Sequence, residues 1–66
     1  MNVETPIGLG QFLKLSGLAE TGGQAKELIA AGEVTVNGEV AYARSRQLHC
    51  GDRVATPLGE ERVQCQ

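Results

Sequence analysis

The chain has 66 residues with one Phe, one Tyr and no Trp, so its core must be built mainly from Leu, Ile, Val and Ala. A domain near this size buries only about 60% of the surface that its unfolded chain exposes, which leaves little material for a deep substrate cleft. The formal net charge of −2 argues against general nucleic-acid binding, because most domains of that kind have a basic balance.

Neither a secretion signal nor a membrane segment is expected. The chain does not open with a basic segment followed by an apolar run, and no stretch approaches the roughly 18 apolar residues of a spanning helix. Cys50 and Cys65 are too few for a disulfide framework, although a bridge between them stays open. We therefore expect residues 1–66 to form a single, non-enzymatic domain in a reduced, cytoplasmic setting.

The first predicted helix follows an extended N-terminal segment. It could start at Thr5-Pro6 or at Gly8, and we favour Gly8 because the apolar residues beyond it then recur at helical spacing. The later start places Leu9, Phe12 and Leu13 on a buried face, and Gln11 and Lys14 on an exposed one. Gly17 is expected to end the helix in the left-handed conformation, with Leu18 packing behind it.

The second predicted helix has the clearest start signal in the chain. Thr21 as N-cap and Gln24 three residues later form a capping-box pattern. The expected buried face consists of Ala25, Leu28 and Ile29. Gly32 is expected to end this helix.

A period of two replaces the helical period after Gly32. Val34 and Val36 alternate with polar residues, which predicts a strand with one buried face. Asn37-Gly38 follows at once and is a strong hairpin signal, since both positions tolerate positive φ. Residues 39–42 are expected to form the return strand.

The C-terminal third is expected to complete a small sheet. Leu48 is the expected buried residue of an otherwise irregular segment, and Gly51-Asp52 is a predicted turn. Residues 53–55 and 61–64 are expected to be strands, joined by a turn at residues 57–59. The order of elements predicts an α+β fold, with two short packed helices against a small antiparallel sheet of three to four strands.

The start of the second helix is a candidate anion site. Gly22 and Gly23 leave the backbone N–H groups accessible, and Lys26 lies one turn further along. The alternative is that the two glycines only form a tight turn between the helices.

Arg44 and Arg46 are candidate phosphate ligands, because an extended backbone would point both guanidinium groups to the same side. The alternative is a solvated strand edge on which charge discourages aggregation. Lys14 alone would be an ordinary surface lysine. Taken together, these basic residues suggest a local patch, although several acidic residues are intermixed with it.

No catalytic or metal site can be assembled from the sequence. His49 is the only histidine, and no strand–turn–helix nucleophile context accompanies it. His49, Cys50 and Cys65 fall short of the usual four-ligand zinc set. We expect no metal and no cofactor.

Much of the chain resembles a known family. The residues that carry the resemblance are Leu9-Gly10-Gln11-Phe12-Leu13-Lys14, Gly22-Gly23-Gln24-Ala25-Lys26, Leu28-Ile29, Gly32-Glu33-Val34-Thr35-Val36-Asn37-Gly38-Glu39, Leu48 and Gly51-Asp52. In this order they resemble the S4 domain, an RNA-binding module named after a small-subunit ribosomal protein. The resemblance covers roughly residues 9–54 and is greatest to short stand-alone bacterial members.

The resemblance implies a helix pair called the αL motif, packed on a small sheet, that binds structured RNA such as ribosomal or transfer RNA. The contacts it implies by position are Gln11, Lys14, Gly23, Lys26, Arg44 and Arg46, to which the helix-start reasoning adds Gly22. The leading hypothesis is therefore a monomeric, ribosome-associated, rRNA-binding protein, with a ribosomal or RNA-processing protein as a further partner.

A rival hypothesis is a protein-interaction adaptor that docks through a sheet edge and in which RNA binding is absent or secondary. Its motivation is the negative net charge, together with the few basic residues in the stretch directly after the hairpin, where only Arg44 and Arg46 remain.

Overall fold

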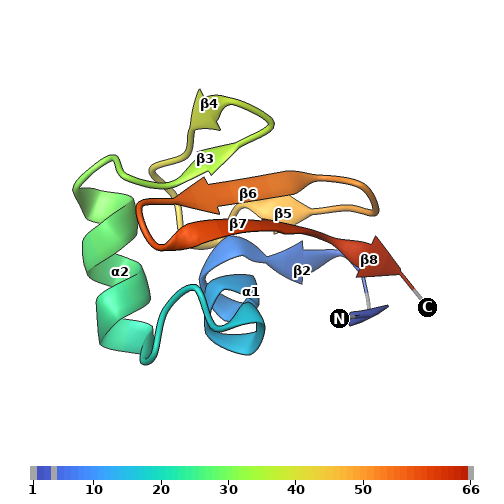
Figure 1. Ribbon diagram of the computed structural model, residues 1–66, viewed down its shortest axis with the longest axis horizontal. Coiled ribbons are helices and arrows are strands. Elements are labelled where there is room, and N and C mark those ends of the chain that lie inside the picture. The colour runs from blue at the N-terminus through green and yellow to red at the C-terminus, as the bar shows by residue number, and fades with distance from the viewer. Residues whose placement is uncertain (1, 4, 66) are drawn as a thin grey trace.

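The computed structural model describes residues 2–3 and 5–65. The helices in this part of the chain are α1 (Leu9–Ser16) and α2 (Gly22–Ala30). The strands are β1 (Asn2–Val3), β2 (Ile7–Gly8), β3 (Thr35–Val36), β4 (Glu39–Val40), β5 (Gln47–Leu48), β6 (Arg53–Thr56), β7 (Gly59–Arg62) and β8 (Gln64–Cys65). Figure 1 shows β2 leading directly into α1, with α2 beside the ends of the central strands.

The main sheet has four antiparallel strands in the order β4-β3-β6-β7. A second, antiparallel pair joins β2 to β5, and a parallel pair joins β1 to β8. The fold class expected from the sequence is confirmed, since two short helices pack with a small antiparallel sheet. The β1–β8 and β2–β5 pairs were not anticipated, because they join segments that lie far apart in the chain.

Both helices begin and end at the expected residues. Gly8 precedes α1 in an extended conformation, and Gly17 ends it with φ of 83°. At the start of α2, the Thr21 hydroxyl accepts a hydrogen bond of 3.0 Å from the Gln24 N–H. The Gln24 side chain reaches back to the N–H of Glu20, one residue before the cap, at 2.6 Å. The two caps therefore fix the short connection between the helices.

A single apolar core joins the helices to the sheets. Its buried members are Ile7, Leu9, Phe12, Leu13, Leu18, Ala19, Ala25, Ile29, Val34, Val36, Ala41, Leu48, Val54 and Val63, with Leu28 packed partly buried against them. The buried faces expected for the first helix, for the first hairpin strand and for Leu48 are confirmed, and that of the second helix is confirmed for Ala25 and Ile29, whereas Leu28 is only partly buried. No buried polar side-chain atom in the described residues lacks a hydrogen-bond partner.

The hairpin turn is linked to the neighbouring strand by side chains. Asn37 adopts φ of 53° and Gly38 adopts φ of 87°, as the Asn-Gly pair predicted. The Asn37 amide oxygen accepts from the Arg53 N–H at 3.0 Å, and its NH2 group donates to Asp52 at 3.1 Å. The other carboxylate oxygen of Asp52 accepts from the His49 N–H at 2.8 Å.

These contacts make Asp52 a pH-sensitive element of the fold. The hydrogen bond from the His49 backbone lowers the pKa of Asp52 below its ordinary value; partial burial opposes this effect, and the Asn37 amide and the charge of Arg46 add to it. A lowered pKa means that the ionised form stabilises the fold, and that this contribution is lost as pH falls below about 4.

We expect Asp52→Asn to lower the free energy of unfolding by about 1 kcal/mol near neutral pH, the scale of one charge-assisted hydrogen bond at a partly exposed site. The wild type and the variant should then converge in acid, because protonated Asp52 no longer provides the carboxylate. Urea denaturation followed by circular dichroism across this pH range tests the expectation. An equal difference at every pH would show that ionisation of Asp52 plays no part.

Two further features of the structure concern the cysteines and the length of the helices. Cys50 is disulfide-bonded, and Cys65 is the only other cysteine in the chain. This outcome differs from the reduced state that the small number of cysteines favoured. Among the described residues, neither helix has the length and apolarity needed to span a bilayer.

Candidate nucleic-acid interface

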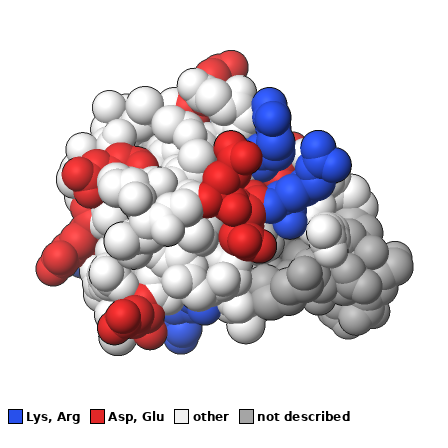
Figure 2. Space-filling view, viewed as in Figure 1, with Lys and Arg blue, Asp and Glu red and all other residues white. Residues whose placement is uncertain are grey.

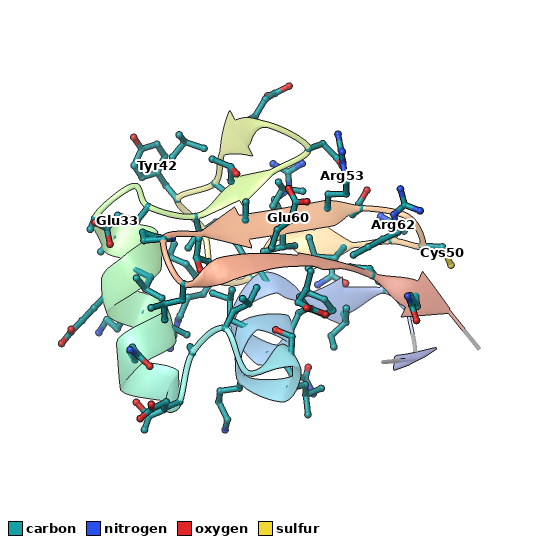
Figure 3. All side chains as sticks on the ribbon, in the orientation of Figure 1. Glu33, Tyr42, Cys50, Arg53, Glu60 and Arg62 are labelled. Carbon is teal, nitrogen blue, oxygen red and sulfur yellow. The ribbon has the colours of Figure 1, made fainter. Side chains whose placement is uncertain are left out.

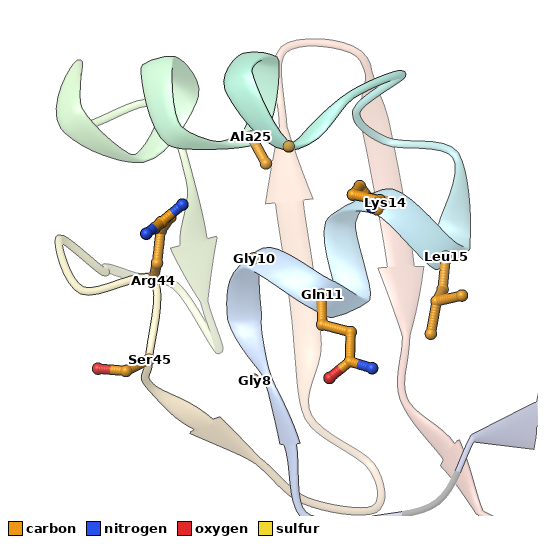
Figure 4. Close-up of a pocket in the computed structure, with 9 residues that line it drawn as sticks. Gly8, Gly10, Gln11, Lys14, Leu15, Ala25, Arg44 and Ser45 are labelled. Carbon is orange, nitrogen blue, oxygen red and sulfur yellow. The ribbon is translucent and has the colours of Figure 1, made fainter.

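A cavity of about 540 Å³ opens between α1, α2 and the turn after β4. Its lining residues are Gly8, Gly10, Gln11, Lys14, Leu15, Gly22, Ala25, Arg44 and Ser45. Figure 4 shows Arg44 on the turn at one side of the cavity, with Ser45 next to it pointing away from α1, and Gln11, Lys14 and Leu15 arranged along α1. The cavity therefore brings together four of the residues expected to bind RNA, namely Gln11, Lys14, Gly22 and Arg44.

Backbone hydrogen bonds attach the turn to the start of α1. The Leu9 N–H donates to the Arg46 carbonyl at 2.8 Å, and the Gly10 N–H donates to the Arg44 carbonyl at 3.1 Å. These bonds satisfy two of the N–H groups that the first turn of a helix leaves unpaired. They also continue the β2–β5 ladder, so the position of Arg44 is set by pairing between distant segments.

Two glycines let the basic side chains lie against the backbone of the cavity wall. A Cβ atom at Gly10 would lie 3.5 Å from the aliphatic stem of Arg44. A Cβ atom at Gly22 would lie 3.8 Å from the stem of Lys14. Both distances are ordinary van der Waals contacts, so the glycines lie directly beside the two stems, and Arg44 and Lys14 flank the cavity from different elements.

Both cations are available to a ligand. The side chains of Lys14 and Arg44 are exposed, and neither has an ion pair within the described part of the chain. An exposed, unpaired ammonium or guanidinium group can bind a phosphate without first breaking an internal ion pair.

The expected pairing of Arg44 with Arg46 on one side is wrong. Residues 43–46 form a turn closed by a 3.1 Å hydrogen bond from the Arg46 N–H to the Ala43 carbonyl, so the backbone is not extended there. Arg44 consequently lines the cavity, whereas Arg46 does not and instead lies close enough to Asp52 to lower its pKa. Alternation of side chains applies only to an extended strand.

The start of α2 retains free donors beside the cavity. The Gln24 N–H is occupied by Thr21, but no acceptor for the N–H groups of Gly22 and Gly23 is found in the described residues. Gly22 lines the cavity, while Gly23 and Lys26 are exposed outside it. The anion site expected at this helix is therefore geometrically open, with Lys14 rather than Lys26 as the cation that shares the cavity.

Sequence reasoning missed Ser45, Leu15, Gly8 at the end of β2 and Gly10 in α1 as parts of this site. Leu15 is 52% exposed despite being apolar, and it falls outside the buried stripe of its helix. The signal that the sequence offered for this site was an apolar residue, Leu15, outside the apolar stripe of its helix. Tyr42, the only tyrosine, is 72% exposed and rests on Gly32, away from the cavity.

Acidic groups dominate a different surface. Figure 2 shows many of them on the face that β7 crosses, with two basic side chains at one edge. Figure 3 identifies the basic pair as Arg53 and Arg62, near Glu60. The two arginines are directly opposite each other in the β6–β7 ladder. The net charge of −2 is thus distributed unevenly, and it does not describe the cavity.

No group of three or more His, Cys, Asp or Glu side chains suited to a metal ion occurs in residues 2–3 and 5–65. The polar groups of the described residues that line the cavity are two cations, an amide, a hydroxyl and backbone groups, which can bind and orient a ligand.

Comparison with known proteins identifies the family of the chain. Residues 2–64 match the model of the S4 domain family. The chain is also 48% identical over 48 residues to the protein of Bacillus subtilis (strain 168) named "Probable ribosome maturation protein RlbA", covering 73% of this chain and 68% of that relative. The match extends over nearly the whole chain, so the protein belongs to the S4 domain family.

Proposed function

We propose that the protein binds structured RNA without catalysing a reaction, through the surface that surrounds the cavity. The observation that carries this proposal is the convergence on one cavity, beside the start of α2, of Lys14 and Arg44, neither of which has an ion pair with a described residue. Membership of the S4 domain family supports RNA as the polymer, and the name of the Bacillus subtilis relative supports ribosomal RNA as its source.

The groups at the cavity suit the backbone of folded RNA. Lys14 and Arg44 provide charges for two phosphates, and the free N–H groups of Gly22 and Gly23 provide a third site at a helix N-terminus. Gln11 and Ser45 offer both donors and acceptors, which suits the 2′-hydroxyl groups that distinguish RNA from DNA. Lys26 and Arg46 lie further out, where they add to the electrostatic attraction.

A binding titration tests the proposal. Purified protein is titrated against fragments of ribosomal RNA, with duplex DNA of equal length as the control, at several salt concentrations. We expect RNA to bind more tightly, with log affinity falling against log salt by about 0.7–0.9 for each phosphate bound and a total slope of about −2 to −3. Absence of RNA binding even at low salt would reject the proposal and favour the protein-adaptor alternative.

A further inference from the structure

We propose that the cavity holds one unstacked nucleotide of the bound RNA, with the base inside it and a phosphate at its rim. This inference rests on the RNA-binding function proposed above. The volume of about 540 Å³ lies within the range of about 300–1,000 Å³ that small-ligand sites occupy. A surface that only followed an RNA duplex would need no such hollow, because paired A-form RNA is contacted on its phosphates and 2′-hydroxyls.

The interior of the cavity suits the flat face of a base. Leu15 lines it and is 52% exposed, although burial of a leucine side chain in the core would be favourable. Ala25 and the bare backbone of Gly8 and Gly10 line other parts of the cavity and add to its largely apolar wall. A base that covered Leu15 would remove this apolar surface from water.

The rim supplies the polar groups that a nucleotide needs. The amide of Gln11 and the hydroxyl of Ser45 have no hydrogen-bond partner within the described residues, so both are free to meet a base edge or a ribose. Arg44 and Lys14 provide the positive charge that a phosphate requires, and a guanidinium plane also stacks on unpaired bases. The cavity therefore combines an apolar interior with cations at its edge, as a nucleotide combines a base with a phosphate.

Two short RNA hairpins with the same closing loop test the inference. One has a fully paired stem, and the other has the same stem with a single added, unpaired 2-aminopurine, whose fluorescence reports on its surroundings. We expect the protein to bind the second about tenfold more tightly, with a clear change in fluorescence. This lies near the lower end of the range measured for base stacking on aromatic side chains, because Leu15 and the Arg44 guanidinium take the place of an aromatic ring here.

A side chain that fills the cavity should abolish the preference for the hairpin with the unpaired nucleotide, while binding of RNA itself is retained. A Cβ atom at Gly10 makes only ordinary contact with the Arg44 stem, so Gly10→Ala is the matched control, whereas Gly10→Leu extends a side chain into the space beside Arg44. Both replacements favour the helix over glycine. Leu15→Gln, at an exposed position, removes the apolar wall without a core change. We expect Gly10→Leu and Leu15→Gln to bind both hairpins equally, and Gly10→Ala to keep the tenfold preference.

The outcomes separate the two proposals. Equal binding of both hairpins by the wild-type protein would overturn the nucleotide pocket and leave RNA binding in place. Binding of neither hairpin would overturn RNA binding and the pocket with it. Displacement of the hairpin by free adenosine monophosphate at equal concentration would also overturn the inference, since it would indicate a small-molecule site rather than a site for a nucleotide within RNA.

Discussion

Replacing Lys14 and Arg44 together by glutamine is expected to weaken RNA binding by about a hundredfold at low salt. Each side chain is exposed at the cavity and has no ion pair with a described residue, so each replacement removes one charge-assisted hydrogen bond to a phosphate, which is worth roughly 1.5 kcal/mol or more. The salt dependence should fall as well, by about 0.7–0.9 in slope for each phosphate released. Fluorescence anisotropy with a labelled ribosomal RNA fragment at several salt concentrations measures both quantities.

The double replacement of Arg53 and Arg62 by glutamine is the matched control. It removes the same formal charge of two, but these arginines face each other on β6 and β7 outside the cavity. We expect less than about a threefold reduction of affinity, because charges away from the binding surface are screened by salt. Similar reductions for the two double variants would mean that RNA responds only to net charge, and the cavity would no longer explain binding.

Leu13→Ala is expected to have the largest effect on stability. The side chain of Leu13 is completely buried between α1 and the rest of the core. Truncation of such a leucine costs about 2–5 kcal/mol, the sum of reduced apolar burial and an unfilled cavity. A small domain has little stability in reserve, so much of the population should unfold at moderate temperature.

Leu15→Ala provides the comparison within the same helix, since the chemical change is identical and Leu15 is 52% exposed. We expect its free energy of unfolding to change by less than about 1 kcal/mol. Urea titrations monitored by circular dichroism compare the two variants directly. Equal destabilisation would contradict the assignment of Leu13 to the core and Leu15 to the ligand-binding surface.

The helices and the hairpin were predictable because their signals are local. Thr21 and Gln24 cap α2 through neighbouring backbone groups, and Gly17 ends α1 with the positive φ expected of it. Asn37-Gly38 likewise determines the turn between β3 and β4. In each case the physical cause lies within four residues of its effect, so the order of residues is sufficient to identify it.

The candidate site was only partly predictable because long-range pairing builds it. Lys14 and Gln11 were identified from their helical face, whereas the position of Arg44 depends on the pairing of β2 with β5 and on hydrogen bonds to the start of α1. The turn that separates Arg44 from Arg46 follows from these distant interactions. The close approach of the Arg44 stem to Gly10 becomes visible only when another segment is placed against the helix.

The measurement that tests RNA binding at the cavity most directly is an NMR titration of the 15N-labelled protein with a ribosomal RNA fragment. Each backbone amide is observed separately in a chain of 66 residues. If RNA binds at the cavity, the resonances of Gly10, Gln11, Gly22 and Ser45 should shift most, and those of Glu60 and Glu61 should stay in place. The largest shifts on β6 and β7, with Gly10 and Ser45 unchanged, would contradict binding at the cavity.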